Sequence, residues 1–242
     1  MTAPPRSRPP FDPEQVPLSP PEPGWLAVDP VHLQADWLRS RFTQTPSWQP
    51  EVFEDVQIDQ HVRLRDASVL IPLIARPQGM QLLLTRRTAN LHVHPGQISF
   101  PGGSRDAADA SAQHTALREA EEEIGLQAAW VEPLGSMPVY TTITGYAVTP
   151  VVGMVDPQAP LRAQASEVAE VFEVPLAFLM DPAHHQLRTW DTQTGLGAPL
   201  TRPNPARRSF YAMPWISPDG RRYFIWGATA AMIRNLYRLL IA

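Results

Sequence analysis

Two apolar runs separated by a short turn constrain the fold of this 242-residue chain more than any other feature. The first run, ASVLIPLIAR, spans residues 67–76, and the second, GMQLLLTRR, spans residues 79–87. Both runs are rich in Val, Ile or Leu, and the Pro77-Gln78-Gly79 sequence between them is typical of a tight turn. Short, continuously apolar runs bounded by turn residues are typical of buried strands. The sequence therefore predicts a buried β-hairpin.

Strand-like and helix-like segments follow one another in the rest of the chain. Residues 131–155 are rich in Thr and Val and are predicted to be mainly strand, and residues 166–180 to hold a strand and a short helix. This mixed order predicts a single α+β domain in which helices cover a sheet. Near the C-terminus, apolar residues recur at helical spacing: Ala228, Met232, Ile233, Leu236, Leu239 and Leu240.

The N-terminal segment is dominated by proline. Nine prolines precede Gly24, and proline donates no backbone hydrogen bond and disfavours helices and sheet ladders. Residues 1–24 are therefore predicted to form an extended tail, either disordered or draped over the body of the protein. A docking motif for a partner is the alternative.

Residues 25–60 are predicted to form a helical extension packed on the core, ahead of a main domain over residues 61–242. A helix is expected to begin with Asp29 as its N-cap and Pro30 at its first position. Its apolar face, which would contact the core, consists of Leu33, Trp37, Leu38 and Phe42.

Composition and charge exclude several classes of protein. A net charge of −4 gives no general attraction to nucleic acid or to an anionic membrane. No apolar stretch approaches the length of a membrane span, and the N-terminus lacks the apolar core of a signal peptide. Cysteine is absent, which excludes disulfides, thiolate metal sites and cysteine nucleophiles. A cytoplasmic protein that binds neither nucleic acid nor membrane is expected.

An unusual concentration of acid follows the hairpin. Residues 112–125 are predicted to be helical, with Gly125 ending the helix. At helical spacing Glu119, Glu122 and Glu123 share one face, where their like charges repel. A divalent cation would turn this repulsion into attraction, and clustered carboxylates suit Mg²⁺ or Mn²⁺. A solvated acidic helix face is the simpler alternative.

The neighbours of this face favour a ligand. Arg118 is expected to pair with one carboxylate and fix its orientation. Upstream, Phe100-Pro101-Gly102-Gly103 forms a turn in which the glycines allow the backbone to approach a ligand closely. A metal ion could therefore take a backbone carbonyl from this loop in addition to carboxylates from the helix.

Together these residues resemble the Nudix box, usually written G-x5-E-x7-R-E-U-x-E-E-x-G-U with U apolar. Residues 118–126, REAEEEIGL, match its C-terminal half completely. In the N-terminal half Gly103 matches, but Asp109 replaces Glu and one additional residue precedes Arg118. Asp109 is either an N-cap or a support for the ligand face. The resemblance implies a Nudix-type α/β/α sandwich with a mixed central β-sheet and a catalytic helix.

Residues 83–103 are in addition similar to the signature of the coenzyme A diphosphatase branch of this family, L-L-T-x-R-S/A-x3-R-x3-G-x3-F-P-G-G. Thr88 replaces Ser or Ala, and His92 stands where the signature has its second Arg. A neutral His has one donor and no permanent charge, so phosphate contact there is weakened; a charged His92 and a simple surface His both stay open. The matching residues are Leu83, Leu84, Thr85, Arg87, Gly96, Phe100, Pro101, Gly102 and Gly103.

The resemblance implies Mg²⁺- or Mn²⁺-dependent hydrolysis of a nucleoside diphosphate-linked substrate, most specifically coenzyme A to 3',5'-ADP and 4'-phosphopantetheine. It also implies a role for each matching residue. The metal ligands would be Glu119, Glu122, Glu123 and Gly103. The substrate-binding residues would be Arg87, Gly96, Phe100 and Gly102, and Arg118 would assist catalysis.

The base that takes the proton of the attacking water is Glu122 or Glu167, with Glu170 as an alternative to Glu167. Arg87 is the chosen phosphate contact, but a strand register shifted by one residue would favour Arg86.

Three further alternatives remain. The substrate could be NADH or ADP-ribose, or the chain could be a catalytically silent nucleotide-binding module. A zinc site involving His184 and His185 or His92 and His94 lacks matching ligands. The expected partner is a small nucleotide, and a homodimer remains open.

Overall fold

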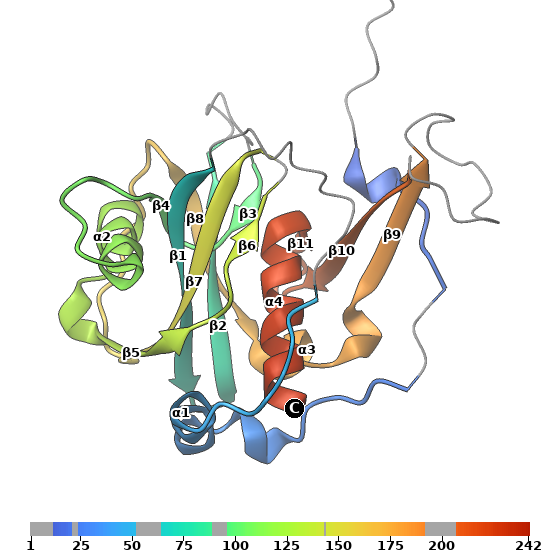
Figure 1. The fold of residues 1–242 in the computed structure, drawn as a ribbon, viewed down its shortest axis with the longest axis horizontal. Helices are drawn as coiled ribbons and strands as arrows, with labels where there is room; N and C mark the ends of the chain where they lie inside the picture. The colour runs from blue at the N-terminus through green and yellow to red at the C-terminus, as the bar shows by residue number, and fades with distance from the viewer. Residues whose placement is uncertain (1–11, 21–23, 52–63, 89–95, 143, 192–206) are drawn as a thin grey trace, which may run out of the picture.

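The computed structural model of the protein describes residues 12–20, 24–51, 64–88, 96–142, 144–191 and 207–242 (Figure 1). Two sheets form its frame. The larger has eight strands, with the order β3-β2-β1-β7-β5, while β4 pairs with β1, β6 with β7, and β8 with β2. Its strands are β1 (Arg65–Arg76), β2 (Gly79–Arg87), β3 (Ile98–Ser99), β4 (Gly102–Ser104), β5 (Val131–Ser136), β6 (Tyr140–Thr141), β7 (Tyr146–Val155) and β8 (Val168–Pro175).

The predicted hairpin is confirmed at the centre of this sheet. Strands β1 and β2 pair in antiparallel fashion, with Leu73 opposite Leu82, while β1 also runs parallel to β7 over ten residue pairs. The sheet is therefore mixed. In its N-terminal half, β1 pairs with the short strand β4 and not with β2, and Ser68 lies opposite Gly103. This exchange of partners brings the Gly-Gly turn beside the central strand.

Helices cover both faces of the large sheet (Figure 1). Helix α2 (Ala112–Ile124) covers one face and packs on Leu70, Ile74 and Leu83. Helices α3 (Leu176–Leu179) and α4 (Gly227–Ile241) lie on the other face, over Ile71 and Leu82. Residues of β1 and β2 thus pack into two separate cores, one on each face of the sheet, because successive side chains of a strand point to opposite faces. The structure confirms an α+β sandwich with a mixed central sheet.

A second, three-stranded sheet lies beside α4. It has the antiparallel order β11-β10-β9, formed by β9 (Gln186–Asp191), β10 (Arg207–Ile216) and β11 (Arg222–Trp226). Residues 12–20 of the Pro-rich segment run along β9: the Ser19 N–H donates to the Leu187 carbonyl at 2.8 Å, and the Thr189 N–H donates to Pro17 at 3.1 Å. Val16 is 1% exposed. This part of the predicted tail is extended and packed on the domain, after a short 3₁₀ turn, η1 (Pro13–Gln15).

The helical extension differs from its prediction in one respect. Asp29 does cap a turn by accepting from the Val31 N–H at 2.9 Å, but that turn is a short 3₁₀ helix, η2 (Pro30–Leu33). Gln34 then adopts an extended conformation, and α1 (Ala35–Thr43) begins without a side-chain cap. The single expected helix is therefore two pieces. The break turns both Leu33 and Leu38 into the core.

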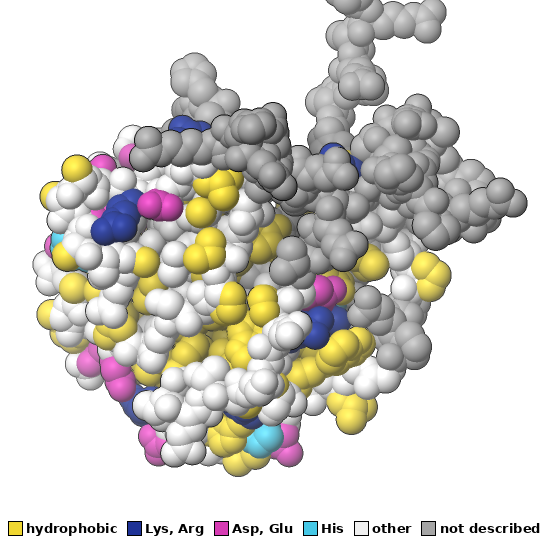
Figure 2. Space-filling model, in the orientation of Figure 1, with side chains coloured by type: hydrophobic (Ala, Val, Ile, Leu, Met, Phe, Trp, Pro, Cys, Tyr) yellow, Lys and Arg dark blue, Asp and Glu magenta, His cyan; other side chains and the backbone are white. Residues whose placement is uncertain are grey.

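Two short 3₁₀ turns, η3 (Ala128–Trp130) and η4 (Pro182–His184), complete the described elements. On the face seen in Figure 2, acidic and basic side chains lie scattered among apolar and uncharged surface. No described helix is long and apolar enough to cross a membrane.

Candidate active site

The predicted acidic helix is confirmed as α2. Ser111 caps its N-terminus, because its hydroxyl accepts from the His114 N–H at 3.1 Å. Gly125 ends it in the left-handed conformation (φ 67°), which glycine adopts without steric strain. The alternative that Asp109 is the N-cap is therefore wrong.

Burial divides the glutamates of α2. Glu123 and Glu119 are largely buried, with side chains 5% and 16% exposed, whereas Glu122 is 60% exposed and Glu121 lies at the surface. Glu123 accepts from the Gly102 N–H at 3.2 Å and lies 3.5 Å from an Arg87 guanidinium nitrogen. The ligand face therefore has two inner carboxylates and one at its rim.

These carboxylates raise each other's proton affinity. Burial raises the pKa of Glu123 to about 7, in spite of the Gly102 hydrogen bond and the nearby Arg87 charge. Burial also raises the pKa of Glu119, and the charges of Glu122 and Glu167 add to the increase. The negative charges are thus desolvated and only partly neutralised by protein groups. A bound cation would relieve both effects.

The glycines of the turn give these carboxylates room. A Cβ atom on Gly102 would lie 2.6 Å from the Val69 Cα in the adjacent backbone of β1. A Cβ atom on Gly103 would lie 2.6 Å from the carboxylate of Glu119. A side chain at Gly102 would separate β4 from β1, and one at Gly103 would occupy the space next to the inner carboxylate.

Asp109 holds Arg118 in place. The Nε and an Nη of Arg118 donate to the two Asp109 oxygens at 3.1 and 3.0 Å, and Thr115 donates its hydroxyl to Asp109 at 3.0 Å. The hydrogen bonds from Arg118 and from the Asp106 N–H hold the pKa of Asp109 well below its usual range. Asp109 is 3% exposed. It therefore supports the ligand face through Arg118, in spite of its shorter side chain and the additional loop residue.

Arg118 in turn holds the rim of the cluster. Its guanidinium lies 3.0 Å from a Glu119 oxygen and 3.1 Å from a Glu122 oxygen, and it donates to the Ser104 carbonyl at 3.1 Å. Glu122 is therefore turned toward Arg118 rather than toward the two inner carboxylates.

The two candidate arginines of β2 point to opposite faces of the sheet. Arg87 faces Glu123 on the α2 side. Arg86 lies on the other side, stacked over the ring of Tyr223 at 4.8 Å and paired with Glu170 at 3.4 Å. The register of β2 therefore places Arg87, and not Arg86, at the carboxylate cluster.

The two candidate distal glutamates are separated in the same way. Glu170 accepts from Arg221 at 2.6 Å and from the Tyr223 hydroxyl at 2.8 Å on the face away from α2. Glu167 lies near enough to Glu119 and Glu123 for its charge to raise the pKa of both. Its exposed carboxylate makes no ion pair or hydrogen bond with the described residues. Of the two, Glu167 belongs to the cluster.

The remaining predicted residues lie in different surroundings. Gly96 occupies an exposed turn with φ 70°. The side chain of Phe100 is 2% exposed and packs in the core, so the expected substrate contact through this ring is not met. His185 is turned inward, where it contacts the Leu179 carbonyl at 2.7 Å and Arg234 at 3.1 Å. His92 and His94 lie outside the described residues.

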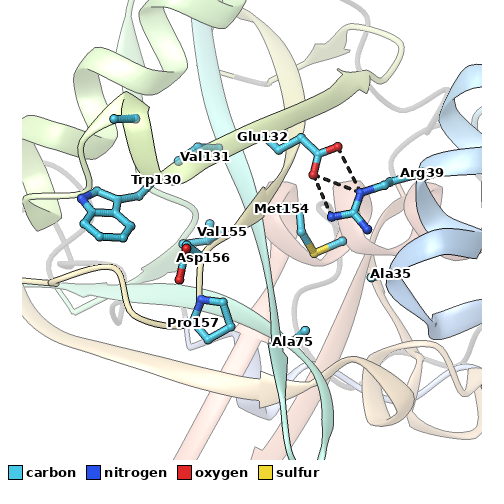
Figure 3. Close-up of a pocket in the computed structure, with 11 residues that line it drawn as sticks. Ala35, Arg39, Ala75, Trp130, Val131, Glu132, Met154, Val155, Asp156 and Pro157 are labelled. Carbon is cyan, nitrogen blue, oxygen red and sulfur yellow. Dashed lines mark hydrogen bonds and ion pairs between the residues drawn. The ribbon is translucent and has the colours of Figure 1, made fainter.

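A hollow of about 410 Å³ lies at the other end of the sheet (Figure 3). It is lined by Ala75 and Val155, at the carboxyl ends of β1 and β7, and by Arg39 and Glu132. Ala75 is seven residues from Ser68, which is roughly 20 Å along a strand. Arg39 donates to both Glu132 oxygens at 2.8 to 3.0 Å. This hollow is therefore remote from the carboxylate cluster, and its lining holds Asp156 in addition to the paired Arg39 and Glu132.

The donor set of the cluster fits a hard divalent cation, because it consists of carboxylate and backbone oxygens. Within the described ranges, no three acidic or histidine side chains converge closely enough to hold an ion alone. An ion would therefore complete its shell with backbone oxygen, water or substrate phosphate. Mg²⁺ suits such a site because it retains several waters and takes few protein ligands. Mn²⁺ suits it as well because it prefers the same oxygen ligands.

Comparisons with known proteins identify the family of the chain. The Nudix domain model matches residues 64–193. The uncharacterized Nudix hydrolase NudL of Escherichia coli strain K12 is 43% identical over 173 residues, which cover 71% of this chain and 81% of NudL. The protein of the same name in Shigella boydii serotype 18 shows the same identity and coverage.

Solved structures show weaker similarity. The Nudix hydrolase RenU of M. smegmatis has a TM-score of 0.41 at 24% identity, covering 46% of this chain and 71% of RenU. The site and the sequence matches define an enzyme that hydrolyses nucleoside diphosphate-linked compounds with the help of divalent metal cations. The chain belongs to the Nudix family and is a Nudix hydrolase.

Proposed function

We propose that this Nudix hydrolase cleaves coenzyme A or its acyl derivatives to 3',5'-ADP and (acyl-)4'-phosphopantetheine. The reaction class rests on the two inner carboxylates: Glu119 lies against Gly103, and Glu123 lies beside Arg87. The choice of substrate rests on the similarity of residues 83–103 to the coenzyme A branch. Arg87, the first basic residue of that signature, faces the cluster.

The ion that we propose at this site is Mg²⁺ or Mn²⁺, held by Glu119, Glu123, Gly103 and, after rotation away from Arg118, Glu122. When bound, it would supply charge neutralisation on the diphosphate and polarise the attacking water. Arg87 would orient a phosphate oxygen from the β2 side. Gly102 and Gly103 would let the diphosphate approach the backbone closely.

Hydrolysis requires a group that takes the proton of the attacking water. Water oxygen forms the new bond to one phosphorus, the P–O bond to the bridging oxygen breaks, and the bridging oxygen leaves with the second phosphate. We propose Glu167 as the base, because its carboxylate is near the cluster and pairs with none of the described residues, whereas Glu122 is engaged by Arg118. Glu122 remains the alternative base.

We also propose that the catalytic domain extends over residues 61–242, beyond the residues that the Nudix model matches. Helix α4 contributes Ile233, Leu236 and Leu240 to the same core as β1 and β2. The Thr229 hydroxyl donates to the Ile98 carbonyl of β3 at 3.0 Å. Removal of this helix would expose one face of the catalytic sheet.

A substrate panel tests the proposal. Coenzyme A, acyl-coenzyme A, NADH and ADP-ribose are incubated with Mg²⁺ or Mn²⁺ and with wild type, Glu119→Gln or the exposed control Glu121→Gln. We expect hydrolysis of coenzyme A in wild type and in the control, and a loss of about 10²- to 10³-fold in Glu119→Gln.

The panel also separates the alternatives. Preference for ADP-ribose or NADH would contradict the coenzyme A assignment and leave the reaction class intact. No hydrolysis of any compound by the wild type would contradict the reaction and favour a binding module.

A further inference from the structure

Thr88 lies at the junction between β2 and the loop that carries Glu167. It directly follows Arg87 and is 9% exposed. Its N–H donates to the Glu167 carbonyl at 2.9 Å, and its hydroxyl donates to the Ser166 carbonyl at 3.2 Å. Two consecutive carbonyls of the loop are thus bound by one buried residue.

The other end of this loop is bound to the catalytic helix. The Gln164 N–H donates to the Glu123 carbonyl at 2.8 Å, and the Gln164 carbonyl accepts from the N–H groups of Glu167 and Val168 at 2.9 and 2.8 Å. The loop therefore forms a tight turn between α2 and β2. Since residues 164–167 are all exposed, hydrogen bonds and not packing determine its position.

A bulge in β8 directs the loop to the α2 side. Arg86 pairs with Glu170, but Arg87 pairs with Val168, so Ala169 is an additional residue on β8. Glu170 is held on the opposite face by Arg221 and Tyr223, and Val168 is buried. The bulge thus lets Glu167 emerge beside the carboxylate cluster, and Thr88 contributes the side-chain hydroxyl that closes the turn.

We propose that Thr88 is a positioning residue, which sets the distance of the Glu167 carboxylate from the inner carboxylates of α2. This inference rests on the proposed function, in which Glu167 takes the proton of the attacking water. A displacement of about 1 Å at a catalytic group can lower a rate substantially. Ser166 is exposed, so water would replace the lost hydroxyl at its carbonyl and the fold would remain intact.

Four variants test this role: Thr88→Val, Thr88→Ser, Glu167→Gln and the double variant Thr88→Val/Glu167→Gln. We expect Thr88→Val to lower kcat about tenfold without a change in KM, and Thr88→Ser to restore it. In the Glu167→Gln background, Thr88→Val should have no further effect, because the group that it positions is already lost. Thr189→Val is the matched control, since that buried hydroxyl bonds to Ser209 in the second sheet.

Several outcomes would overturn the inference. These are wild-type kcat in Thr88→Val, equal losses in both backgrounds, failure of the Ser variant to restore kcat, or full activity of Glu167→Gln. The first three leave the proposed function intact as long as wild type hydrolyses coenzyme A, whereas full activity of Glu167→Gln would also contradict the proposed role of Glu167 as the base.

Hydrogen exchange gives a readout that does not depend on turnover. Thr88→Val should speed amide exchange at Glu167 and Val168, and Thr88→Ser should restore slow exchange. Unchanged exchange in Thr88→Val would overturn the inference even if the wild type hydrolysed none of the four compounds, an outcome that would separately contradict the proposed function.

Discussion

Two clusters of buried charge lie on opposite faces of the large sheet, and they differ in how their charges are balanced. Beneath α4, Arg234 is 3% exposed; it donates to Glu51 at 3.1 Å and lies about 5 Å from the rings of Trp25 and Tyr211. Beside α2, Glu119 and Glu123 repel each other and are repelled by Glu167. In the first cluster Glu51 is paired with both Arg234 and Arg238, at 3.1 and 3.4 Å, whereas the second has an excess of negative charge.

His185 adds no charge to the cluster beneath α4. Its Nε2 contacts the Leu179 carbonyl, so this nitrogen carries the proton, and its Nδ1 accepts from Arg234. Burial lowers the pKa of His185 to about 4, and the neutral ring therefore adds no positive charge to those of Arg234 and Arg238. A cluster of this kind stabilises one arrangement of the fold. The α2 cluster, in contrast, would reach charge balance when a cation binds, as we propose.

The largest change in stability is expected from Arg234→Met, which leaves Glu51 without this partner. Glu51 is 21% exposed and keeps Arg238 and the Tyr211 hydroxyl as partners, so the expected cost is at the lower end of that of breaking a buried ion pair, about 3 kcal/mol. Urea denaturation at pH 7 measures the effect. The matched control Arg222→Met removes an exposed pair with Glu14 and should cost less than about 1 kcal/mol. Equal losses in the two variants would contradict a special role for the Arg234 cluster.

The second prediction concerns acid stability. The pKa of His185 is about 4 in the folded protein and about 6.5 in the unfolded chain. As pH falls, the unfolded state therefore takes up the proton first. The stability that the neutral His185 ring contributes is complete above pH 6.5 and is lost as pH drops toward 4. The loss is about 3 kcal/mol. His185→Gln should lack this loss of stability at low pH. The free energy of unfolding, measured against pH for wild type and variant, isolates the loss as the difference between the two curves. Parallel curves would contradict a neutral, buried His185 ring.

On the opposite face, Glu123→Gln should stabilise the protein while it abolishes metal-dependent hydrolysis. The pKa of Glu123 is about 7 in the folded protein and about 4.5 in the unfolded chain. The stability that the protonated carboxyl contributes to the fold is therefore complete below pH 4.5 and is lost as pH rises to 7. At pH 8 without metal, the variant should gain about 2 kcal/mol. Denaturation in the presence of a chelator measures this gain. A less stable variant would mean that the ionised carboxylate is well satisfied in the free protein.

The smallest effect is expected at the exposed pair of Arg39 and Glu132 beside the hollow of Figure 3. Their side chains are 41% and 52% exposed, and the shortest contact is 2.8 Å. Glu132→Gln should cost less than about 1 kcal/mol, and less again at high salt. A larger loss would show that charge balance matters as much at the surface as beneath α4.

The sequence predicts those features that depend on local periodicity. The hairpin, α2 with its cap at Gly125, and the last helix follow from apolar spacing and from breakers, and the structure confirms them. The spacing of Glu119 and Glu123 also places both on one face. Local rules do not find the break at Gln34, because the burial of both Leu33 and Leu38 in the core of the folded domain accompanies it.

Contacts distant in sequence could not be predicted in the same way. The docking of residues 12–20 on β9 requires the position of a strand about 170 residues further along. The turn between α2 and β2 depends on pairing of β2 with β8, so the hydrogen bonds of Thr88 have no signal in the sequence around Thr88. The orientation of Arg86 and Arg87 was likewise open until the register was known.

The central claim, that α2 carries an unbalanced charge cluster that a divalent cation completes, is tested most directly by stability as a function of Mg²⁺ or Mn²⁺ concentration. The free energy of unfolding of the wild type should rise with metal, by about 2.7 kcal/mol at 100 times the Kd. Glu119→Gln should show little or no rise, and Glu121→Gln should follow the wild type. A wild type whose stability is independent of metal, or a Glu119→Gln variant that responds as the wild type does, would contradict the claim.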